Sequence, residues 1–372
     1  MRFPEFSGEW EEHTLSEYLE FKNGLNPDAK RIGSGLPFIS VMDILSEGVI
    51  NYDNIRGKVN ATEKEIECFG VKDGDLLFQR SSETLEDVGR ANVYMDNRTA
   101  IYGGFVIRGR KIGNYDPLFF KYLLATPLAR KRTCRMGAGA QHFNIGQEGL
   151  SKISLYFPSI EEQRKIAEFL SLIDERIATQ NKIIDKLQSL IKGIRNDVFG
   201  KLRKDIGLNA KVGDVLSYEQ PQPYIVEDTE YTAGGTPVLT ANKAFVLGYT
   251  SETDGIYDKG DCIIFDDFTL DCKYVDFPFK VKSSAIKILT AKNKELLRYT
   301  FEFLKYLDLS TDEHKRHYIA ETQNQEFILP TTQIVRTIAH AFSTLSSRMQ
   351  TIVKQRDMLE LQKQYLLRQM FI

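Results

Sequence analysis

The chain contains a long internal repeat, which limits the folds available to it more than any single motif does. When the 372-residue sequence is shifted so that Pro158 falls on Pro330, residues 158–199 align with residues 330–371 without a gap. Further identical residues then coincide along the segment: Arg164 and Arg336, Ile166 and Ile338, Ala167 and Ala339, Ser171 and Ser343, Arg176 and Arg348, Leu187 and Leu359, and Phe199 and Phe371. Self-similarity at a fixed offset indicates duplicated structural units.

Both copies have the apolar spacing of a long amphipathic helix. Apolar residues recur at alternating intervals of four and three, which is the a/d seam of a heptad repeat. The seam residues are Ile166, Leu170, Ile173, Ile177, Ile184 and Leu187 in the first copy, and Ile338, Phe342, Leu345, Met349, Ile352 and Leu359 in the second. A helix of about 40 residues is roughly 60 Å long at ~1.5 Å per residue. Each copy therefore predicts a rod.

The first copy also carries the start signal of a helix. Pro158 is followed by Ser159 and, three residues later, by Glu162, which is the S-x-x-E pattern of a capping box. Such a seam is equally typical of a general dimerisation coiled coil. The segments that precede each rod have to decide between these two interpretations.

Strand-like runs fill the segments before the rods. They lie between turn-forming residues, at residues 36–41, 74–78 and 260–265. Residues 35–39 resemble residues 235–239, so the similarity extends beyond the rods. We therefore predict an α+β protein with the order globule, rod, globule, rod.

The predicted boundaries follow from this order. They are residues 1–157 for the first globule, 158–204 for the central helix, 205–329 for the second globule and 330–372 for the C-terminal helix. Two similar halves of one chain tend to pack about a pseudo-twofold axis, as identical subunits do in an isologous dimer. We expect two tandem α/β globules separated by two antiparallel coiled-coil helices.

The overall charge gives no sign of a nucleic-acid partner. The chain has 49 basic and 51 acidic residues, a formal net charge of -2. A global positive field is therefore absent, and any contact with nucleic acid has to be local.

The cysteines and the apolar segments point to a cytoplasmic protein. The four cysteines, Cys68, Cys134, Cys262 and Cys272, form no C-x-x-C pair, which argues against a zinc site and favours reduced thiols. No apolar segment has the length of a signal-peptide core or a membrane span. We expect a cytoplasmic location and no contact with a membrane.

The first globule contains a local basic run. Between Asp116 and Glu148 the sequence has no acidic residue, and the run leads into a small-residue loop at residues 137–146. Small residues allow close approach to a groove, arginines suit phosphates, and Gln, His and Asn suit base edges. The candidate DNA contacts here are Arg130, Arg132, Arg135, Gln141, His142 and Asn144. An ordinary solvated helix followed by a flexible loop is the alternative.

Loops after the strand-like runs supply further candidates. In the first globule they are Gln79, Arg80, Ser81 and Ser82, and in the second they are Asn242, Lys243, Asp267, Thr269, Arg316 and His317. A carboxylate can accept a hydrogen bond from cytosine N4, so an acidic loop in the second globule is compatible with a different target sequence. Ordinary polar turns explain the same residues.

Motifs for catalysis are weak. The sequence has no G-x-x-x-x-G-K-[ST] phosphate loop, and its Gly137-Ala138-Gly139 segment lacks the third glycine of a dinucleotide fold. Asp258, Asp271 and Lys273 imitate a nuclease cluster, but such spacings are common by chance. The five histidines show no metal-ligand spacing, so we predict no metal site.

The opening of the first rod resembles a known family. Residues 157–167, which read Phe-Pro-Ser-Ile-Glu-Glu-Gln-Arg-Lys-Ile-Ala, are similar to the helix opening of the specificity (S) subunit of Type I restriction-modification systems. The tandem layout of the whole chain fits the same family. The second opening, residues 330–336, departs from the pattern because it lacks the pair Glu162-Gln163, here called the E-Q pair.

The resemblance implies a function without catalysis in this chain. Each globule would be a target-recognition domain that reads one half of a bipartite site in double-stranded DNA. The helices would act as a spacer and as a docking surface for DNA adenine methyltransferase (modification) subunits. Those partners would bring AdoMet, and a restriction subunit would bring ATP/Mg and translocation, while this chain would hold no cofactor.

Two other functions stay open from the residues alone. The first is a self-contained DNA nuclease or methyltransferase that uses Asp258, Asp271 and Lys273. The second is a coiled-coil adaptor that binds only protein. Turnover by the purified chain would favour the first, and binding to a methyltransferase without any DNA protection would favour the second.

Overall fold

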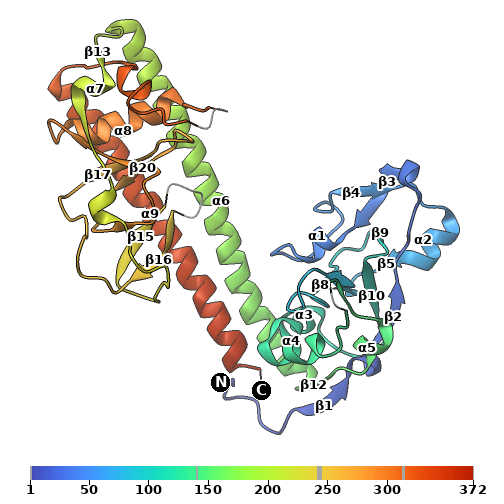
Figure 1. Ribbon diagram of the computed structural model, residues 1–372. Helices are drawn as coiled ribbons and strands as arrows, with labels where there is room; N and C mark the ends of the chain where they lie inside the picture. Colours follow the sequence, from blue (N-terminus) through green and yellow to red (C-terminus); the bar gives the residue numbers. More distant parts are fainter. Residues whose placement is uncertain (1, 140, 241–244, 312–314, 372) are drawn as a thin grey trace. The chain divides into compact units, whose positions relative to one another are not determined.

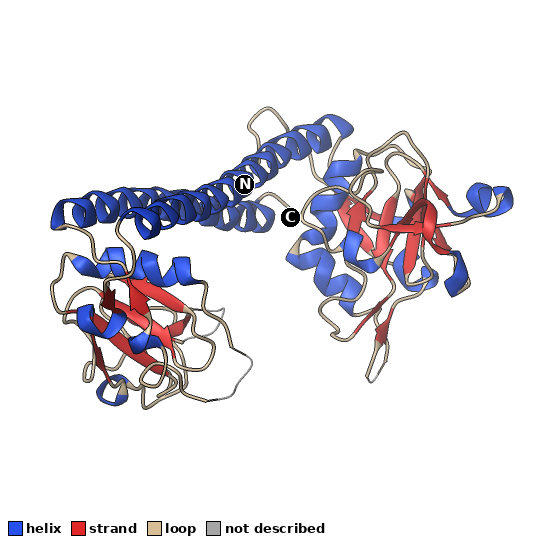
Figure 2. Cartoon of the chain, turned by 90° about the horizontal axis from the view of Figure 1, so that it is seen from above, coloured by secondary structure: helices blue, strands red, loops and turns tan. Residues whose placement is uncertain are grey.

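The computed structural model describes residues 2–139, 141–240, 245–311 and 315–371. The chain divides into two compact units. Unit 1 comprises Met1–Asn181 and Gln355–Ile372, and unit 2 comprises Lys182–Lys354. Each unit contains a globular part with strands and short helices and one segment of each of two long helices (Figures 1 and 2).

The globular part of unit 1 contains two four-stranded sheets. The first has the order β2 (Leu19–Asn23), β10 (Val106–Lys111), β6 (Leu76–Gln79) and β8 (Ala91–Val93). The second has the order β4 (Gly57–Val59), β3 (Ile32–Ile39), β9 (Ala100–Tyr102) and β5 (Gly70–Val71). All pairs in the first sheet are antiparallel, and β3 pairs with β9 in parallel. Two small sheets pair β1 (Glu11–Thr14) with β12 (Ser154–Phe157) and β7 (Ser81–Ser82) with β11 (Phe143–Asn144).

Short helices follow where the sequence supplies caps. They are α1 (Val41–Ile44), α2 (Glu63–Phe69), α3 (Pro117–Ala125), α4 (Pro127–Cys134) and α5 (Gln147–Ser151), with 3-10 turns at Leu15–Glu17 and Ala29–Arg31. The Asp116 side chain accepts the Phe119 amide at 2.9 Å and caps α3. The Thr126 hydroxyl caps α4 in the same way, and a proline begins each helix. This combination fixes both helix starts.

Unit 2 repeats the strand order of unit 1. Its four-stranded antiparallel sheet has the order β14 (Leu216–Glu219), β20 (Ile286–Ala291), β17 (Cys262–Asp266) and β18 (Cys272–Val275). A three-stranded sheet has the order β16 (Val246–Thr250), β15 (Thr236–Leu239) and β19 (Lys280–Val281), with β15 and β19 parallel. The remaining elements are β13 (Ala210–Lys211), β21 (Glu326–Phe327), α7 (Val212–Val215), α8 (Leu296–Leu307) and 3-10 turns at Gln222–Tyr224 and Thr322–Asn324.

The same backbone hydrogen bonds recur in the two globular parts. In unit 1 the Arg80 amide donates to Phe105 O at 2.9 Å, and in unit 2 the Asp267 amide donates to Ala285 O at 3.0 Å. The Ile145 amide donates to Arg80 O in unit 1. The His317 amide donates to Asp267 O in unit 2, and both distances are 3.0 Å. The duplication inferred from the rods therefore extends through the sheets, and Arg80 and Asp267 occupy equivalent positions.

Two long helices connect these elements along the chain. Helix α6 (Ile160–Asp205) has 46 residues and α9 (Thr332–Gln369) has 38, which confirms the two predicted rods. The Glu162 amide donates to the Ser159 hydroxyl at 3.4 Å at the start of α6. Among the helices of the described residues, none is long and apolar enough to cross a membrane.

Within unit 1 the two long helices run antiparallel. The first half of α6 buries Ile166, Leu170, Ile173 and Ile177 in one core with Leu366 and Met370, near the end of α9, while Leu359 is half-buried. Lys363 occupies a seam position without apolar character, and its ammonium pairs with Asp174 at 2.5 Å. Asn181 accepts a hydrogen bond from Arg356 at 3.5 Å in the same unit. Polar seam positions therefore meet polar partners.

Within unit 2 the second half of α6 packs against the first half of α9. The buried contributors to this packing include Ile184, Phe199, Val335 and Phe342. The Arg195 guanidinium lies 5.8 Å from the Phe342 ring centroid. The other predicted seam residues, Leu187, Ile338, Leu345, Met349 and Ile352, are half-buried.

Candidate nucleic-acid interface

The E-Q pair fixes the globular part of unit 1 to the start of α6. Glu162 accepts hydrogen bonds from Arg2 at 2.7 Å (Nε) and 2.6 Å (Nη2). Gln163 accepts from the Asp116 amide at 3.1 Å and donates to Pro158 O at 3.0 Å. Because Asp116 also caps α3, this one glutamine ties α6 to the helix of the globular part.

The second copy uses apolar packing at the same place. Ile334 and Val335 occupy the positions that match the E-Q pair, and Val335 is buried in the core of unit 2. The start of α6 is therefore anchored by polar contacts of the E-Q pair, whereas the start of α9 is anchored by hydrophobic packing.

A polar cluster forms where β6 ends in unit 1. Ser81 and Ser82 of β7 pair with Asn144 and Phe143 of β11. The Ser81 hydroxyl also donates to the Asn144 side-chain oxygen. We call Arg80, Ser81, Ser82, Phe143 and Asn144 the strand-end cluster. It joins two loops that are far apart in the sequence and that were predicted separately as DNA contacts.

The loop before Asn144 exposes the other predicted readers. Gln141, His142 and Asn144 are all exposed to solvent. Ala138 and Asn144 exchange backbone hydrogen bonds of 3.0 and 2.9 Å, which close the loop at its base. Gln141 and His142 thus stand on a loop that ends at Asn144 of the strand-end cluster.

The three predicted arginines differ in how they are held. Arg130 donates to the backbone oxygens of Glu86 at 2.8 Å and Val88 at 2.6 Å, and burial lowers its pKa. Arg132 pairs with Glu12 at 2.7 Å. Both guanidinium groups are therefore held by contacts within unit 1, and their contact with phosphates stays a prediction. Arg135 is exposed at the end of α4.

Gln79 also serves the fold instead of facing solvent. It is the last residue of β6 and is buried, and its Nε2 donates to Ser81 O at 2.9 Å. Its backbone bonds continue the sheet, with the amide on Arg90 O at 2.8 Å. The expectation that Gln79 reaches a base is corrected, since the strand extends one residue further than its apolar pattern. Gln79 supports the turn that presents Arg80.

In unit 2 the equivalent position is a buried anchor. The Asp267 Oδ1 accepts the amides of His317 at 3.1 Å and Tyr318 at 2.8 Å, and its Oδ2 lies 3.4 Å from Lys287 Nζ. The His317 ring is also buried, with Nδ1 2.9 Å from a Glu321 carboxylate oxygen. Asp267 and His317 were expected to contact DNA. Both are corrected to positioning residues, because satisfying a buried carboxylate requires these internal donors.

The exposed candidates of unit 2 lie around this anchor. Thr269 is exposed on the turn after β17, and Arg316 is exposed with its guanidinium 6.0 Å from the Phe268 ring centroid. Arg316 also donates to the Ser284 hydroxyl at 3.5 Å. The predicted contacts Asn242 and Lys243 lie outside the described residues. Unit 2 therefore presents a threonine, an arginine and an aromatic ring at the place where unit 1 presents its strand-end cluster.

Two of the three nuclease-like residues, Asp271 and Lys273, take part in ion pairs. Asp271 Oδ1 lies 2.8 Å from Lys305 Nζ, and Asp271 Oδ2 lies 3.0 Å from Lys273 Nζ. Burial raises the pKa of Asp271, but the hydrogen bonds from the two lysines outweigh it and the net shift is downward. Both carboxylate oxygens are thus engaged. In the part of the chain that the structure describes, no three His, Cys, Asp or Glu side chains are grouped to hold a metal ion.

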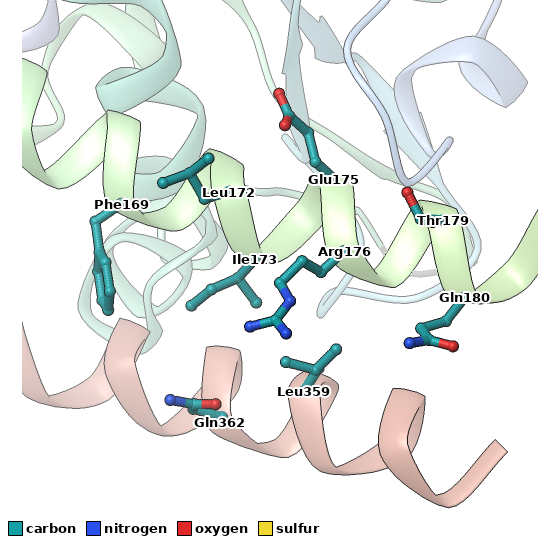
Figure 3. A pocket seen from close by; sticks show the side chains of 9 residues that line it. All are labelled: Phe169, Leu172, Ile173, Glu175, Arg176, Thr179, Gln180, Leu359 and Gln362. Carbon is teal, nitrogen blue, oxygen red and sulfur yellow. The ribbon is translucent and has the colours of Figure 1, made fainter. Parts of the chain in front are cut away.

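A cavity of about 540 Å³ lies between the two long helices within unit 1. Figure 3 shows its lining, with Leu359 and Gln362 of α9 across from Ile173 and Arg176 of α6. Leu172 borders the cavity and is largely exposed. Further exposed apolar side chains of α9 in this unit are Met358, Leu361 and Tyr365. The helix pair of unit 1 therefore carries a cavity of mixed polar and apolar lining and, on α9, further exposed apolar side chains.

Two residues near the clusters were missed from the sequence. Phe105 is exposed beside Arg80, and Lys287 is buried beside Asp267. Pattern alone assigns an aromatic residue next to a strand to the core, and a lysine to the surface. The glycine pair Gly103-Gly104 directly before Phe105 was the available hint of a turn at this place.

Comparisons with known proteins agree with this architecture. Residues 7–189 match the family model described as the Type I restriction modification DNA specificity domain. The specificity subunit of the Type I restriction enzyme EcoR124I/EcoR124II from Escherichia coli is 45% identical over 126 residues, 32% of this chain and 31% of that protein. The Type I restriction enzyme MjaVIII specificity subunit from Methanocaldococcus jannaschii is 25% identical over 205 residues, 54% of this chain and 44% of that protein. The matched parts thus span less than half of either relative.

The fold is also that of a solved specificity subunit. The crystal structure of the Type-I restriction-modification system S subunit from M. genitalium matches with a TM-score of 0.64 and 15% identity, over 98% of this chain and 96% of that chain. At this identity the likeness concerns the fold alone. Residues 7–189 of this chain therefore belong to the family of Type I restriction modification DNA specificity domains, and the relatives named above are specificity subunits of Type I restriction enzymes.

Proposed function

We propose that this chain reads a bipartite site in double-stranded DNA, one half-site with each unit, and that it performs no catalysis itself. The observation that carries the proposal is the repeated framework of the two globular parts. The same backbone bonds hold Arg80 in unit 1 and Asp267 in unit 2, while the surrounding exposed side chains differ. A shared scaffold with different reading groups is what two different half-sites require.

The accessible groups of unit 1 have the chemistry for direct readout. Arg80, which is half-buried, and Asn144, which is exposed, are suited to guanine and adenine edges, and the exposed Arg135 is suited to a phosphate. Gln141 and His142 stand on the neighbouring loop. In unit 2 the corresponding groups are Thr269 and Arg316. Asp267 is not among these reading groups, because its carboxylate holds the loop through internal hydrogen bonds and does not accept a hydrogen bond from cytosine.

Two reading surfaces on one chain are needed for useful selectivity. A good bidentate contact to a base discriminates by about 1–3 kcal/mol, so a unit that reads three or four base pairs finds many sites in a genome. Linking two such units multiplies their selectivity when the link holds them at a fixed separation. The long helices α6 and α9 are candidates for that link, and we expect half-site centres about one helical turn of DNA apart, roughly 10 base pairs.

The helix pair is proposed as the docking surface for DNA adenine methyltransferase subunits. The cavity of about 540 Å³ and the exposed side chains of Leu172, Met358 and Leu361 support this role, since apolar groups on a helix surface favour protein partners. These partners would supply AdoMet and flip the target adenine out of the duplex. Restriction subunits would supply the ATP/Mg chemistry.

The test uses the full chain assembled with co-expressed methyltransferase subunits. The complex is mixed with a pool of randomised duplexes, and bound duplexes are sequenced. Two clusters of specified bases with an unspecified gap are expected, and a single continuous cluster would refute the bipartite reading. The chain alone, incubated with AdoMet or Mg²⁺ and DNA, should give no product. Turnover by the chain alone would instead support the self-contained enzyme.

A further inference from the structure

Phe105 is the most exposed large hydrophobic side chain among the described residues, with an exposed fraction of 69%. Single apolar residues on a surface are common and need no explanation by themselves. Phe105 differs from such residues in three respects. Its backbone is held by a hydrogen bond, the donor of that bond is Arg80 of the strand-end cluster, and unit 2 carries a small residue at the same place.

The turn that carries Phe105 is held on both sides. Phe105 O accepts the Arg80 amide at 2.9 Å, and Gly104 O accepts Arg80 Nη1 at 3.4 Å. A Cβ atom at Gly104 would lie 1.7 Å from the Asn26 side-chain oxygen, so the close approach of Asn26 requires glycine there. A side chain on a fixed turn loses little conformational freedom when it binds a partner.

The position places an apolar ring beside polar reading groups. Arg80, which holds the turn, is followed directly by Ser81, and Ser81 is paired with Asn144 across β7 and β11. Phe105 therefore borders the surface that is proposed to read DNA.

Unit 2 indicates that the fold does not need an aromatic residue here. The equivalent backbone bond runs from the Asp267 amide to Ala285 O at 3.0 Å. Ala285 is half-buried and has only a methyl side chain. The same turn therefore forms with alanine, so the turn itself does not require the exposed ring of Phe105.

Base pairs expose only one apolar group in the major groove, the C5 methyl of thymine. We propose that Phe105 contacts the methyl group of a thymine in the half-site read by unit 1, next to the base pair contacted by the strand-end cluster. This inference rests on the proposed function, since it assigns a base to a surface that reads DNA. It also makes a thymine contact specific to unit 1, because Ala285 is too short to reach equally far.

The experiment removes the Phe105 ring and the thymine methyl group separately. The full chain with its methyltransferase subunits is prepared as wild type, Phe105→Ala and Phe105→Leu. Met42→Ala is the matched control, because Met42 is an exposed apolar residue of unit 1 outside the cluster, with an exposed fraction of 68%. Duplexes of the site selected from the randomised pool carry deoxyuridine in place of each thymine in turn, which deletes only the methyl group. Unfolding midpoints of all variants are measured alongside.

One thymine-to-deoxyuridine change should weaken binding of the wild-type complex by roughly fourfold, the effect of one buried methyl-sized group. Phe105→Ala should weaken binding to the thymine duplex by about tenfold or more and should no longer distinguish deoxyuridine from thymine. Phe105→Leu should keep part of the discrimination, and Met42→Ala should bind as wild type.

Three results would overturn the inference while leaving DNA reading intact. The first is Phe105→Ala binding as tightly as wild type, and the second is a half-site without thymine in either strand. The third is an equal loss of affinity for Phe105→Ala on every duplex, with no effect of deoxyuridine, as an apolar wedge between bases would give. A wild-type complex that selects no specific duplex would overturn the proposed function itself.

Discussion

One buried carboxylate joins α8 of unit 2 to both long helices, and its removal gives the sharpest energetic test of that attachment. Glu302 has an exposed fraction of 1% and lies 2.7 Å from Arg195 of α6 and 2.6 Å from Arg298 of α8. Arg298 also donates to Phe342 O of α9 at 3.3 Å and to the Ser346 hydroxyl. The Glu302→Ala change therefore leaves two guanidinium groups without a carboxylate partner in a nearly dry contact.

The expected cost follows from the burial of the arginines. Their side chains are 13% and 12% exposed, so water reaches them poorly once the carboxylate is gone. Breaking a buried ion pair by removing one partner costs about 3–5 kcal/mol. For a unit of this size that corresponds to a fall of about 6–20 °C in the unfolding midpoint of unit 2.

The assay combines thermal unfolding of the full chain with hydrogen exchange of peptides from α8. Glu295→Ala is the matched control, because Glu295 pairs with Arg336 at 2.7 Å on the surface, where solvent screens the pair and its loss should change stability little. Faster exchange in α8 is expected for Glu302→Ala only. Equal effects of the two substitutions would refute the reasoning, since the arginines would then find water as easily as an exposed pair does.

Three further predictions concern pH, DNA contacts and the helices. Lys121→Met should stabilise unit 1 by about 1 kcal/mol at pH 7, because burial lowers the pKa of Lys121 to about 8 and solvent screens part of the 1.36 kcal/mol per pKa unit. This gain in stability should shrink as the pH rises from about 8 toward 10.5, because the folded wild type has released the lysine proton there and the unfolded chain has not. Unfolding midpoints of both proteins at pH 7 and pH 10 measure the gain, and an equal gain at both pH values would contradict the prediction. Arg135→Ala should weaken binding of the complex to all sequences and reduce the salt slope by about 1, whereas Gln141→Ala should relax one base position; identical binding profiles would mean that phosphate and base contacts are wrongly divided. Inserting one heptad into both α6 and α9 should lengthen the unread gap of the selected site without altering either half-site, and an unchanged gap would exclude the helices as spacers.

The long helices could be predicted because their signal is repeated and periodic. Heptad spacing and the repeat gave both helices to within a few residues, since burial of one helix face leaves a regular pattern. The polar seam residue Lys363 was visible as an interruption, but its partner Asp174 was not. A pattern marks where an apolar contact is missing, whereas the partner depends on which helix lies opposite.

The individual contact residues were harder to predict because residue type does not reveal burial. Gln79, Asp267 and His317 have side chains that suit DNA, yet each is buried and hydrogen-bonded within its own unit. Phe105 was not singled out from the sequence, since an aromatic residue beside an apolar strand is normally part of a core. Gln79, Asp267 and Phe105 all lie where the chain turns at the end of a strand, and a single residue there changes from core to surface.

Mapping of methylated adenines tests most directly whether two units of this chain read two separate half-sites. Genomic DNA is sequenced from cells that express the chain with its methyltransferase partners and from cells that lack the chain. Two reading surfaces joined by continuous helices predict methylation at a split motif with a gap of fixed length, and none of it without the chain. Methylation at one continuous motif, or the same methylation in cells without the chain, would contradict that reading.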